Sequence, residues 1–270
     1  MNWRKVFVIS IIVICILCIN LAVYLKIVEK DNNKEKREEI IIDTVALTEN
    51  FENIFDNEID YQNNILTSAN KKDVTKELVY TTYTKKEKQD GRYDINANIP
   101  YININNNKIE NMNKEIEDIF YNKVNDILLD TENNETIYNV KYKAYVNDNI
   151  LSLVISSELK EGNNSQRLII KTYNYNISSN EVLDINQILN YRMLNAKTVQ
   201  NKINEAIKES VQTSSAYQEL GYNKYIRDLN DEMYKVENTK VFFLGEGKSL
   251  YILYPYGNSN YTRELDLVVM

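Results

Sequence analysis

The fold of this chain is decided by one stretch, Tyr138-Asn139-Val140-Lys141-Tyr142-Lys143-Ala144-Tyr145-Val146. Every second residue of it is apolar or aromatic, and most of the residues between are polar. This period of two predicts a β-strand with one face on a core. Turn-forming residues at 147–149 and 161–165 separate it from two further strand-like stretches, 150–159 and 167–177. Together the three stretches predict an antiparallel meander.

A hairpin and a long helix are predicted upstream of the meander. Residues 76–86 are rich in strand formers, Gln89-Asp90-Gly91 supplies a turn, and residues 93–99 alternate apolar with polar. We expect Pro100 to end the pairing, because it has no N–H to donate. The helix is indicated by one apolar stripe: Ile109, Met112, Ile116, Ile119, Phe120, Val124, Ile127 and Leu128.

Helices and strands are also predicted downstream. Asp184 is placed as a helix N-cap, and residues 195–211 carry Val199, Ile203, Ala206 and Ile207 on one side. Three final strands are expected at 241–244, 250–254 and 264–269. Two consecutive modules, each a hairpin or meander followed by a helix, predict an α+β fold with antiparallel sheets and helices packed on one face.

The N-terminal region predicts a membrane anchor. Residues 6–25 carry no charge and include 14 Val, Ile, Leu or Phe. As a helix they would span roughly 30 Å, the thickness of the bilayer core. The run is longer than the apolar part of a cleaved signal peptide and lacks a small-x-small cleavage site. Neither Cys15 nor Cys18 follows a small residue, which argues against a lipoprotein signal. A buried core helix is the remaining alternative.

The positive charges predict the orientation of this anchor. Arg4 and Lys5 precede the span without an acid, whereas residues 26–39 mix both signs. We therefore expect the N-terminus in the cytoplasm and residues 26–270 outside, at the cell envelope. The four bases Lys30, Lys34, Lys36 and Arg37 leave the opposite orientation as the alternative.

These observations predict five segments. They are a cytoplasmic tip at 1–5, a transmembrane helix at 6–25, and a segment at 26–72 that holds a juxtamembrane spacer and a short helix. A small hairpin-helix domain at 73–132 and a C-terminal α+β domain at 133–270 follow. The short helix is indicated by apolar residues spaced largely three and four apart: Val45, Leu47, Phe51, Ile54, Phe55 and Ile59.

Composition excludes several function classes. The net charge of −7 is unfavourable for binding nucleic acid. Both cysteines lie in the predicted span, so the exterior has no disulfide. The chain contains no histidine, which removes Ser-His-Asp and Cys-His catalysis and His-ligated zinc. We expect no cofactor and no metal.

Three motifs have simpler interpretations. Gly247-Lys248-Ser249 mimics the end of a phosphate loop, but a strand follows where a helix is needed, so we expect a tight turn. Asp56, Glu58 and Asp60 approach calcium-loop spacing without its glycine or its final acid, so we expect a solvated helix end. Glu264 and Asp266 share one strand face, as glycosidase carboxylates could, but their alternation with Leu265 and Leu267 favours an exposed sheet face.

Ligand contacts are predicted from the tyrosines. The chain has 21 of them, and each offers a flat apolar face with a polar tip. Most of them are expected to act as the aromatic residues of core and sheet. Those beside turns remain as candidates for ligand binding: Tyr256 and Tyr261, together with Asn163 and Asn164. No catalytic residue is predicted.

The order of several stretches resembles the extracytoplasmic part of RsiV-type anti-sigma factors and the paired domains of PdaC-type wall polysaccharide deacetylases. The resemblance covers residues 75–270. The stretches that carry it are Tyr93-Asp94-Ile95-Asn96-Ala97-Asn98-Ile99-Pro100, the helix at 109–124, Val140-Lys141-Tyr142 with Asn149-Ile150-Leu151-Ser152-Leu153, Tyr173-Asn174-Tyr175-Asn176-Ile177 with Val182-Leu183-Asp184-Ile185, and Phe242-Phe243-Leu244 to Tyr254-Pro255-Tyr256.

The resemblance implies a non-catalytic module facing the wall that binds a partner, which in RsiV-type proteins is lysozyme. Two departures limit it. Residues 1–5 are too few to hold a sigma factor, so no direct sigma-factor binding is expected. Gly162-Asn163-Asn164-Ser165 replaces the Gly-Gly-Ala-His of many relatives. We therefore expect an extracytoplasmic binding or sensing module for a surface protein such as lysozyme or for a wall glycan. The alternatives are a carboxylate-dependent wall hydrolase and a structural subunit of a membrane complex.

Overall fold

The computed structural model describes residues 24, 26, 51–62, 70–130 and 135–270. By its internal contacts the chain divides into two units, Met1–Glu52 and Asn53–Met270. The transmembrane helix predicted at 6–25 lies outside the described residues, apart from Tyr24. Within the described part of the chain, no helix is both long and apolar enough to cross a membrane.

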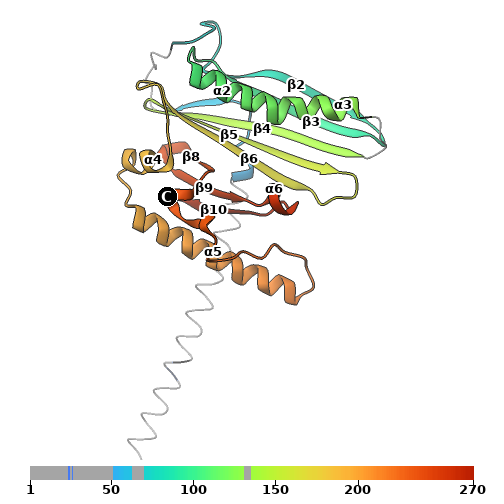
Figure 1. Ribbon diagram of the computed structural model, residues 1–270, viewed down its shortest axis with the longest axis vertical. Coiled ribbons are helices and arrows are strands. Elements are labelled where there is room, and N and C mark those ends of the chain that lie inside the picture. The colour runs from blue at the N-terminus through green and yellow to red at the C-terminus, as the bar shows by residue number, and fades with distance from the viewer. Residues whose placement is uncertain (1–23, 25, 27–50, 63–69, 131–134) are drawn as a thin grey trace, which may run out of the picture. The chain divides into compact units, whose positions relative to one another are not determined.

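The second unit has a mixed α+β fold built on a seven-stranded sheet (Figure 1). Its strands are β1 (Ile59–Gln62), β2 (Val79–Gln89), β3 (Tyr93–Ile102), β4 (Thr136–Asn147), β5 (Ile150–Glu161), β6 (Arg167–Asn176) and β7 (Glu181–Val182). They lie in the order β2-β3-β4-β5-β6-β7, and β1 also pairs with β4. The predicted hairpin and meander are confirmed, since β2 and β3 pair antiparallel, as do β4, β5 and β6.

The predicted antiparallel sheets are confirmed for most strand pairs, but β4 has two parallel neighbours. Residues Thr136 to Val140 pair with β3, and residues Ala144 to Asn147 pair with β1. The chain between β3 and β4 contains the long helix, and parallel neighbours need a crossover of this kind. Strands from both sides of the boundary predicted between residues 132 and 133 therefore join one sheet. Ile59, expected in the short helix, begins β1.

Pro100 does not end the hairpin, contrary to expectation. It lies inside β3, opposite Thr81, and the strand continues to Ile102. The register of β2 shifts between Thr81 and Tyr83, which is a bulge beside the proline. A bulge leaves an extra residue of β2 unpaired. The hydrogen bonding between β2 and β3 can therefore continue past Pro100, which has no N–H to donate.

The predicted long helix is confirmed as three consecutive segments, α2 (Asn107–Ile116), the π-helix η1 (Glu117–Tyr121) and α3 (Asn122–Leu129). They cover one face of the large sheet (Figure 1). The buried Asn113 side chain bonds both main-chain groups of Ile102. Its Oδ1 accepts from Ile102 N at 2.8 Å, and its Nδ2 donates to Ile102 O at 2.9 Å. The core beneath the helix includes Phe120, Val124, Tyr138, Tyr142 and Tyr175.

The opposite side holds a second core. It is built from α4 (Ile185–Tyr191), α5 (Ala196–Glu219) and a three-stranded antiparallel sheet of order β10-β9-β8. The strands are β8 (Phe242–Leu244), β9 (Leu250–Pro255) and β10 (Leu265–Val269), and the one-turn α6 (Gly257–Asn260) precedes β10. The predicted N-cap Asp184 is confirmed by a capping box with Gln187. The helix predicted at 195–211 is also confirmed and continues to Glu219.

Polar side chains of the large sheet hold the edge of β8 that β9 leaves free. Thr172 Oγ1 accepts from Phe242 N at 3.1 Å, and Asn174 Nδ2 donates to Phe242 O at 2.8 Å. Ser152 Oγ accepts from Leu244 N at 3.2 Å and donates to Asn174 Oδ1 at 2.7 Å. Asn147 Nδ2 donates to Leu244 O at 3.3 Å and to Gly245 O at 3.1 Å. Three of these side chains are buried, those of Asn147, Ser152 and Asn174.

We predict that Asn174→Ala lowers the free energy of unfolding by about 1–3 kcal/mol, because it leaves the carbonyl of Phe242 buried without its partner. Urea unfolding measures the change. Asn96→Ala is the matched control. It removes a half-buried asparagine from β3 and should change stability by less than about 0.5 kcal/mol. Equal losses in the two variants would contradict a bridging role for Asn174.

Candidate functional site

The structure places three of the four predicted ligand-binding residues in or against the hairpin of β5 and β6. Asn163 and Asn164 are exposed in the turn between β5 and β6. The exposed ring of Tyr261 lies 5.0 Å from the guanidinium carbon of Arg167, the first residue of β6. Leu168 N donates to Thr262 O at 3.0 Å, which fixes the two segments side by side. We call Asn163, Asn164, Arg167 and Tyr261 the turn surface.

The contact between these segments requires glycine at position 257. A Cβ added to Gly257 would lie 2.0 Å from the carbonyl oxygen of Leu168. The start of α6 is therefore in direct contact with the main chain of β6. Any side chain at this position would push α6, and with it Tyr261, away from Arg167.

Tyr256, the fourth predicted residue, does not belong to the turn surface. Its side chain is buried and contributes to the second core. Its hydroxyl donates to Asp266 Oδ2 at 2.5 Å and lies 2.9 Å from the hydroxyl of Tyr234. The prediction that Tyr256 contacts a ligand is wrong. Its position beside a turn does not determine the direction of its ring, and the ring is directed into the second core.

The expectation of an exposed strand face at Glu264 and Asp266 is also wrong. Asp266 is 5% exposed, and the Glu264 side chain is 15% exposed. Val268, on the same face, is buried. Glu264 directly precedes β10, and the face of β10 that carries Asp266 and Val268 is the covered one, because the second core and a buried arginine lie over it.

That arginine is Arg227, which is 7% exposed. Its Nε and Nη2 donate to the two carboxylate oxygens of Asp266, each at 2.9 Å. Its Nη1 donates to Glu264 Oε2 and to Tyr225 O, each at 2.8 Å, and to Ser214 Oγ at 2.5 Å. One side chain thus joins α5, the segment that follows α5, and β10. We call this the arginine clamp.

Burial and charge act together on the titratable groups of the arginine clamp. Burial opposes the charge of Arg227, but the hydrogen bonds and the negative charge of Asp266 outweigh it and raise the pKa of the guanidinium. Burial, then the Asp266 carboxylate, holds the pKa of Tyr256 far above its ordinary value. Burial also raises the pKa of Tyr234 to about 12. The cluster is therefore a fixed ion pair with neutral phenols around it at neutral pH.

The geometry of the clamp does not suit glycoside hydrolysis. Both carboxylates face the same guanidinium, and a glycosidase needs its two carboxyl groups free on either side of a sugar bond. Asp56, from the calcium-like spacing, forms an ion pair with Lys143 at 2.7 Å. Among the residues that the structure describes, no three His, Cys, Asp or Glu side chains form a group suited to a metal ion.

The phosphate-loop mimic is the tight turn that the sequence predicts. Residues 246–248 form one turn of 3-10 helix between β8 and β9, and Gly247 has a φ of 60°. Lys248 forms an ion pair with Asp148 at 2.7 Å, which raises the pKa of the lysine. The strand β9 follows this turn, so the turn does not lead into an α-helix whose N-terminus could bind phosphate.

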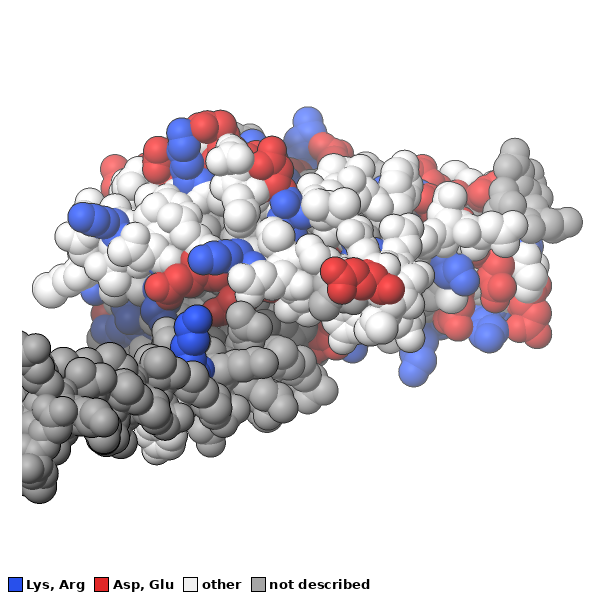
Figure 2. All heavy atoms as spheres, turned by 90° about the horizontal axis from the view of Figure 1, so that it is seen from below, with Lys and Arg blue, Asp and Glu red and all other residues white. Residues whose placement is uncertain are grey.

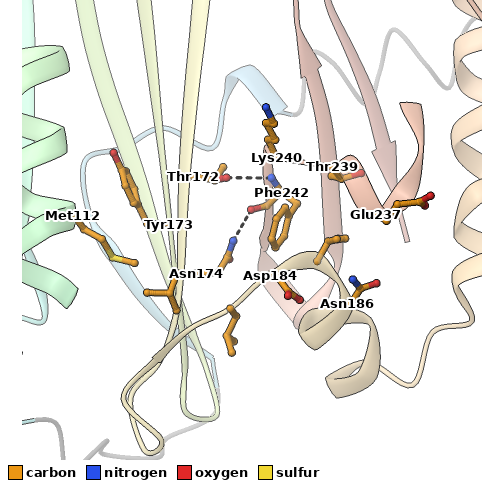
Figure 3. A pocket seen from close by; sticks show the side chains of 13 residues that line it. Met112, Thr172, Tyr173, Asn174, Asp184, Asn186, Glu237, Thr239, Lys240 and Phe242 are labelled. Atoms are coloured by element: carbon orange, nitrogen blue, oxygen red, sulfur yellow. Dashed lines mark hydrogen bonds between the residues drawn. The ribbon is translucent and has the colours of Figure 1, made fainter. Parts of the chain in front are cut away.

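A cavity of about 270 Å³ lies beside β6 (Figure 3). Its lining includes Thr172, Asn174, Asp184, Thr239 and Lys240. Figure 3 shows Thr172 and Asn174 directed to the main chain of Phe242, so two of its polar groups already have partners. Its volume is below the roughly 300–1,000 Å³ of most small-molecule sites. We therefore do not assign it to a cofactor.

Apolar side chains are exposed where α5 ends and the chain turns back. Leu220 is 73% exposed, Tyr222 61%, Ile226 65% and Leu229 51%. We call these four residues the apolar ridge. Sequence reasoning missed both the ridge and the arginine clamp. The segment Tyr225-Ile226-Arg227-Asp228-Leu229 has no helical or strand period, and its charges suggest an ordinary solvated loop.

No protein-family model and no curated protein matches the chain. Several solved structures resemble it, including two members of the DUF3298 family. A DUF3298 family protein from Pseudomonas aeruginosa PAO1 is 10% identical with a TM-score of 0.37, and the match covers 69% of this chain and 85% of that chain. A DUF3298 family member from Bacteroides fragilis is 11% identical with a TM-score of 0.32, covering 66% of this chain and 79% of that chain. At these TM-scores the likeness carries no functional conclusion.

We predict that Arg227→Ala lowers the free energy of unfolding by about 3–5 kcal/mol, because it leaves two carboxylates without their cation. The matched control is Arg263→Ala, which removes an exposed ion pair with Glu158 and should lower it by about 0–1 kcal/mol. Denaturant unfolding followed by far-UV circular dichroism measures both. A difference between them of less than about 1 kcal/mol would contradict the clamp.

Proposed function

We propose that the chain is a single-pass membrane protein whose exterior binds a protein or a glycan at the cell envelope without catalysing a reaction. The uncharged residues 6–25 and the bases before them support the anchor and its orientation. The resemblance to RsiV-type and PdaC-type modules supports a binding role. The observation that supports the non-catalytic part is the arginine clamp, which engages Glu264 and Asp266, the carboxylate pair considered above for hydrolysis.

The turn surface is the proposed ligand contact. It combines a flat aromatic ring with a guanidinium above it and two neighbouring amides, a set that can stack on a sugar ring and bond its hydroxyl groups. Charge argues against nucleic acid. The side seen in Figure 2 intersperses Lys and Arg with Asp and Glu, and the chain carries a net −7.

The anchor predicts where the second unit is found. Protease added to intact cells should degrade residues 53–270, because the exterior orientation leaves them accessible. Immunoblotting with an antibody against this unit measures the loss, and a cytoplasmic protein that stays intact is the control. Full protection of the second unit would contradict the proposed orientation.

The binding role predicts an effect of the turn surface on affinity. We expect the detergent-solubilised full chain to bind purified wall fragments, and Tyr261→Ala to weaken that binding about threefold to tenfold, as the loss of one aromatic contact does. Isothermal titration measures it. Tyr61→Ala is the control, since Tyr61 is exposed in β1 and outside the turn surface. Equal binding by Tyr261→Ala would remove the turn surface as the contact.

Two outcomes would favour the alternatives. Release of wall sugars by the purified chain, abolished by an Asp or Glu substitution that leaves the fold intact, would indicate a hydrolase. Stable co-purification with other membrane proteins, with no binding to wall fragments or to lysozyme, would indicate a structural subunit.

A further inference from the structure

The apolar ridge differs from other exposed apolar side chains of the described residues. Its four members lie within ten residues, and Tyr217, which is 44% exposed, extends it into α5. Val74 and Met193, by contrast, stand alone in the sequence. In Figure 1 the C-terminal end of α5 and the loop after it project beyond both sheets. The ridge is therefore a projecting group of apolar side chains.

The main chain at the end of α5 is paired within the segment itself. Gly221, with a φ of 85°, donates to Gln218 O, and Tyr222 N donates to Tyr217 O. These two bonds form a Schellman motif, and the rings of Tyr217 and Tyr222 make its hydrophobic contact at 5.9 Å. Arg227 holds the other end of the segment through the arginine clamp. A helix end paired in this way can enter an apolar medium without leaving these N–H groups unpaired.

The side chains of this segment point in the reverse of the usual directions. Ile226 and Leu229 face solvent, while Arg227 between them is buried. Folding of the second unit alone favours the opposite arrangement, because apolar burial stabilises and charge burial does not. A clustered, fixed display of apolar groups indicates a contact surface.

The charges around the ridge are mixed, with an excess of acids. Between Glu219 and Lys235 the exposed acids are Glu219, Asp228, Asp231 and Glu232. Lys235 is exposed and forms an ion pair with Glu232 at 2.7 Å, and Lys224 lies half-buried over the ring of Tyr217. Such a surface gains nothing from the charge of an anionic bilayer. A contact with lipid would depend on the apolar side chains and would be strongest with headgroups of no net charge.

The proposed anchor brings a bilayer within reach of the ridge. Residues 26–52 join the span proposed at 6–25 to the second unit, which begins at Asn53. At full extension this link reaches at most about 100 Å. A single acyl chain gives only marginal membrane binding, with a constant of roughly 10⁴ M⁻¹. At the roughly millimolar effective concentration of a tethered group, even a contact of that strength is formed most of the time.

We propose that the apolar ridge docks the second unit onto the lipid bilayer that holds the anchor. Leu220, Tyr222, Ile226 and Leu229 then lie at the boundary between headgroups and acyl chains. The inference rests on the proposed function, which supplies the anchor, and it gives the exterior a membrane contact apart from the turn surface. Docking would restrict the positions that the turn surface takes relative to the bilayer.

The test uses the full chain in vesicles of phosphatidylcholine, with tryptophan as the probe. In a Trp3→Phe background, which removes the one tryptophan of the chain, Tyr222→Trp places a probe on the ridge. Phosphatidylcholine brominated on its acyl chains should quench this probe about twofold or more, because a docked ridge lies at the headgroup–acyl boundary. Tyr261→Trp is the matched control on the turn surface, where Tyr261 is 51% exposed, and it should keep its intensity.

Two further measurements test the cause of the quenching. Adding Ile226→Ser and Leu229→Ser to the Tyr222→Trp chain should abolish it, and circular dichroism checks that this chain is folded. Replacing part of the lipid by phosphatidylglycerol should weaken the quenching, and high salt should restore it, because salt screens the acids beside the ridge from the anionic headgroups.

An alkaline carbonate wash of the vesicles separates the ways in which the inference can fail. If the chain stays in the vesicles and Tyr222→Trp is not quenched, the ridge does not dock on lipid, while the anchor of the proposed function stands. If carbonate removes the chain, both fail. Equal quenching of the two probes would show that the contact is not made by the ridge. A ridge probe whose emission shifts to shorter wavelength with protein concentration, without quenching, would assign the ridge to a second copy of the chain instead.

Discussion

The free edge of β8 is the point on which the arrangement of the second unit depends. A strand edge buried without partners would leave N–H and C=O groups unpaired, each at about 1–3 kcal/mol. Here the partners are side chains of Asn147, Ser152, Thr172 and Asn174, which come from three neighbouring strands of the large sheet. A slip of one residue in any of these strands would turn its side chains to the other face. The register of the meander therefore decides where the small sheet lies.

The position of β8 in turn determines where the arginine clamp lies. β8 positions β9, β9 pairs with β10, and β10 presents Asp266 to Arg227. The buried ion pair is a weak source of stability, because removing two charges from water offsets much of their attraction. Its effect is geometric, since five hydrogen bonds from one guanidinium leave the segment after α5 a single position. Because the segment is held in this position, the side chains of the apolar ridge stay exposed to solvent.

Local patterns predict much of this fold, because alternation and helical spacing depend on neighbouring residues. The hairpin, the meander, the long helix and the cap at Asp184 are all of this kind. The parallel neighbours of β4 cannot be predicted in this way, because no local pattern determines which strand edge a distant strand will join. The same holds for the site. The exposure of Asn163 and Tyr261 could be expected from the turn residues beside them, whereas the directions of Tyr256, Arg227 and Asp266 follow from tertiary contacts.

The parallel pairing of β1 with β4 has a mechanical consequence. The chain enters the large sheet at Ile59, beside a strand that lies in its interior. A pull along β1 from the preceding residues acts on its backbone bonds to β4 all at once, together with those from Asn57 N to Tyr142 O and from Ala144 N to Glu58 O. Under a pull in that direction the attachment is loaded in shear, and the tension passes directly to β4, an interior strand of the sheet.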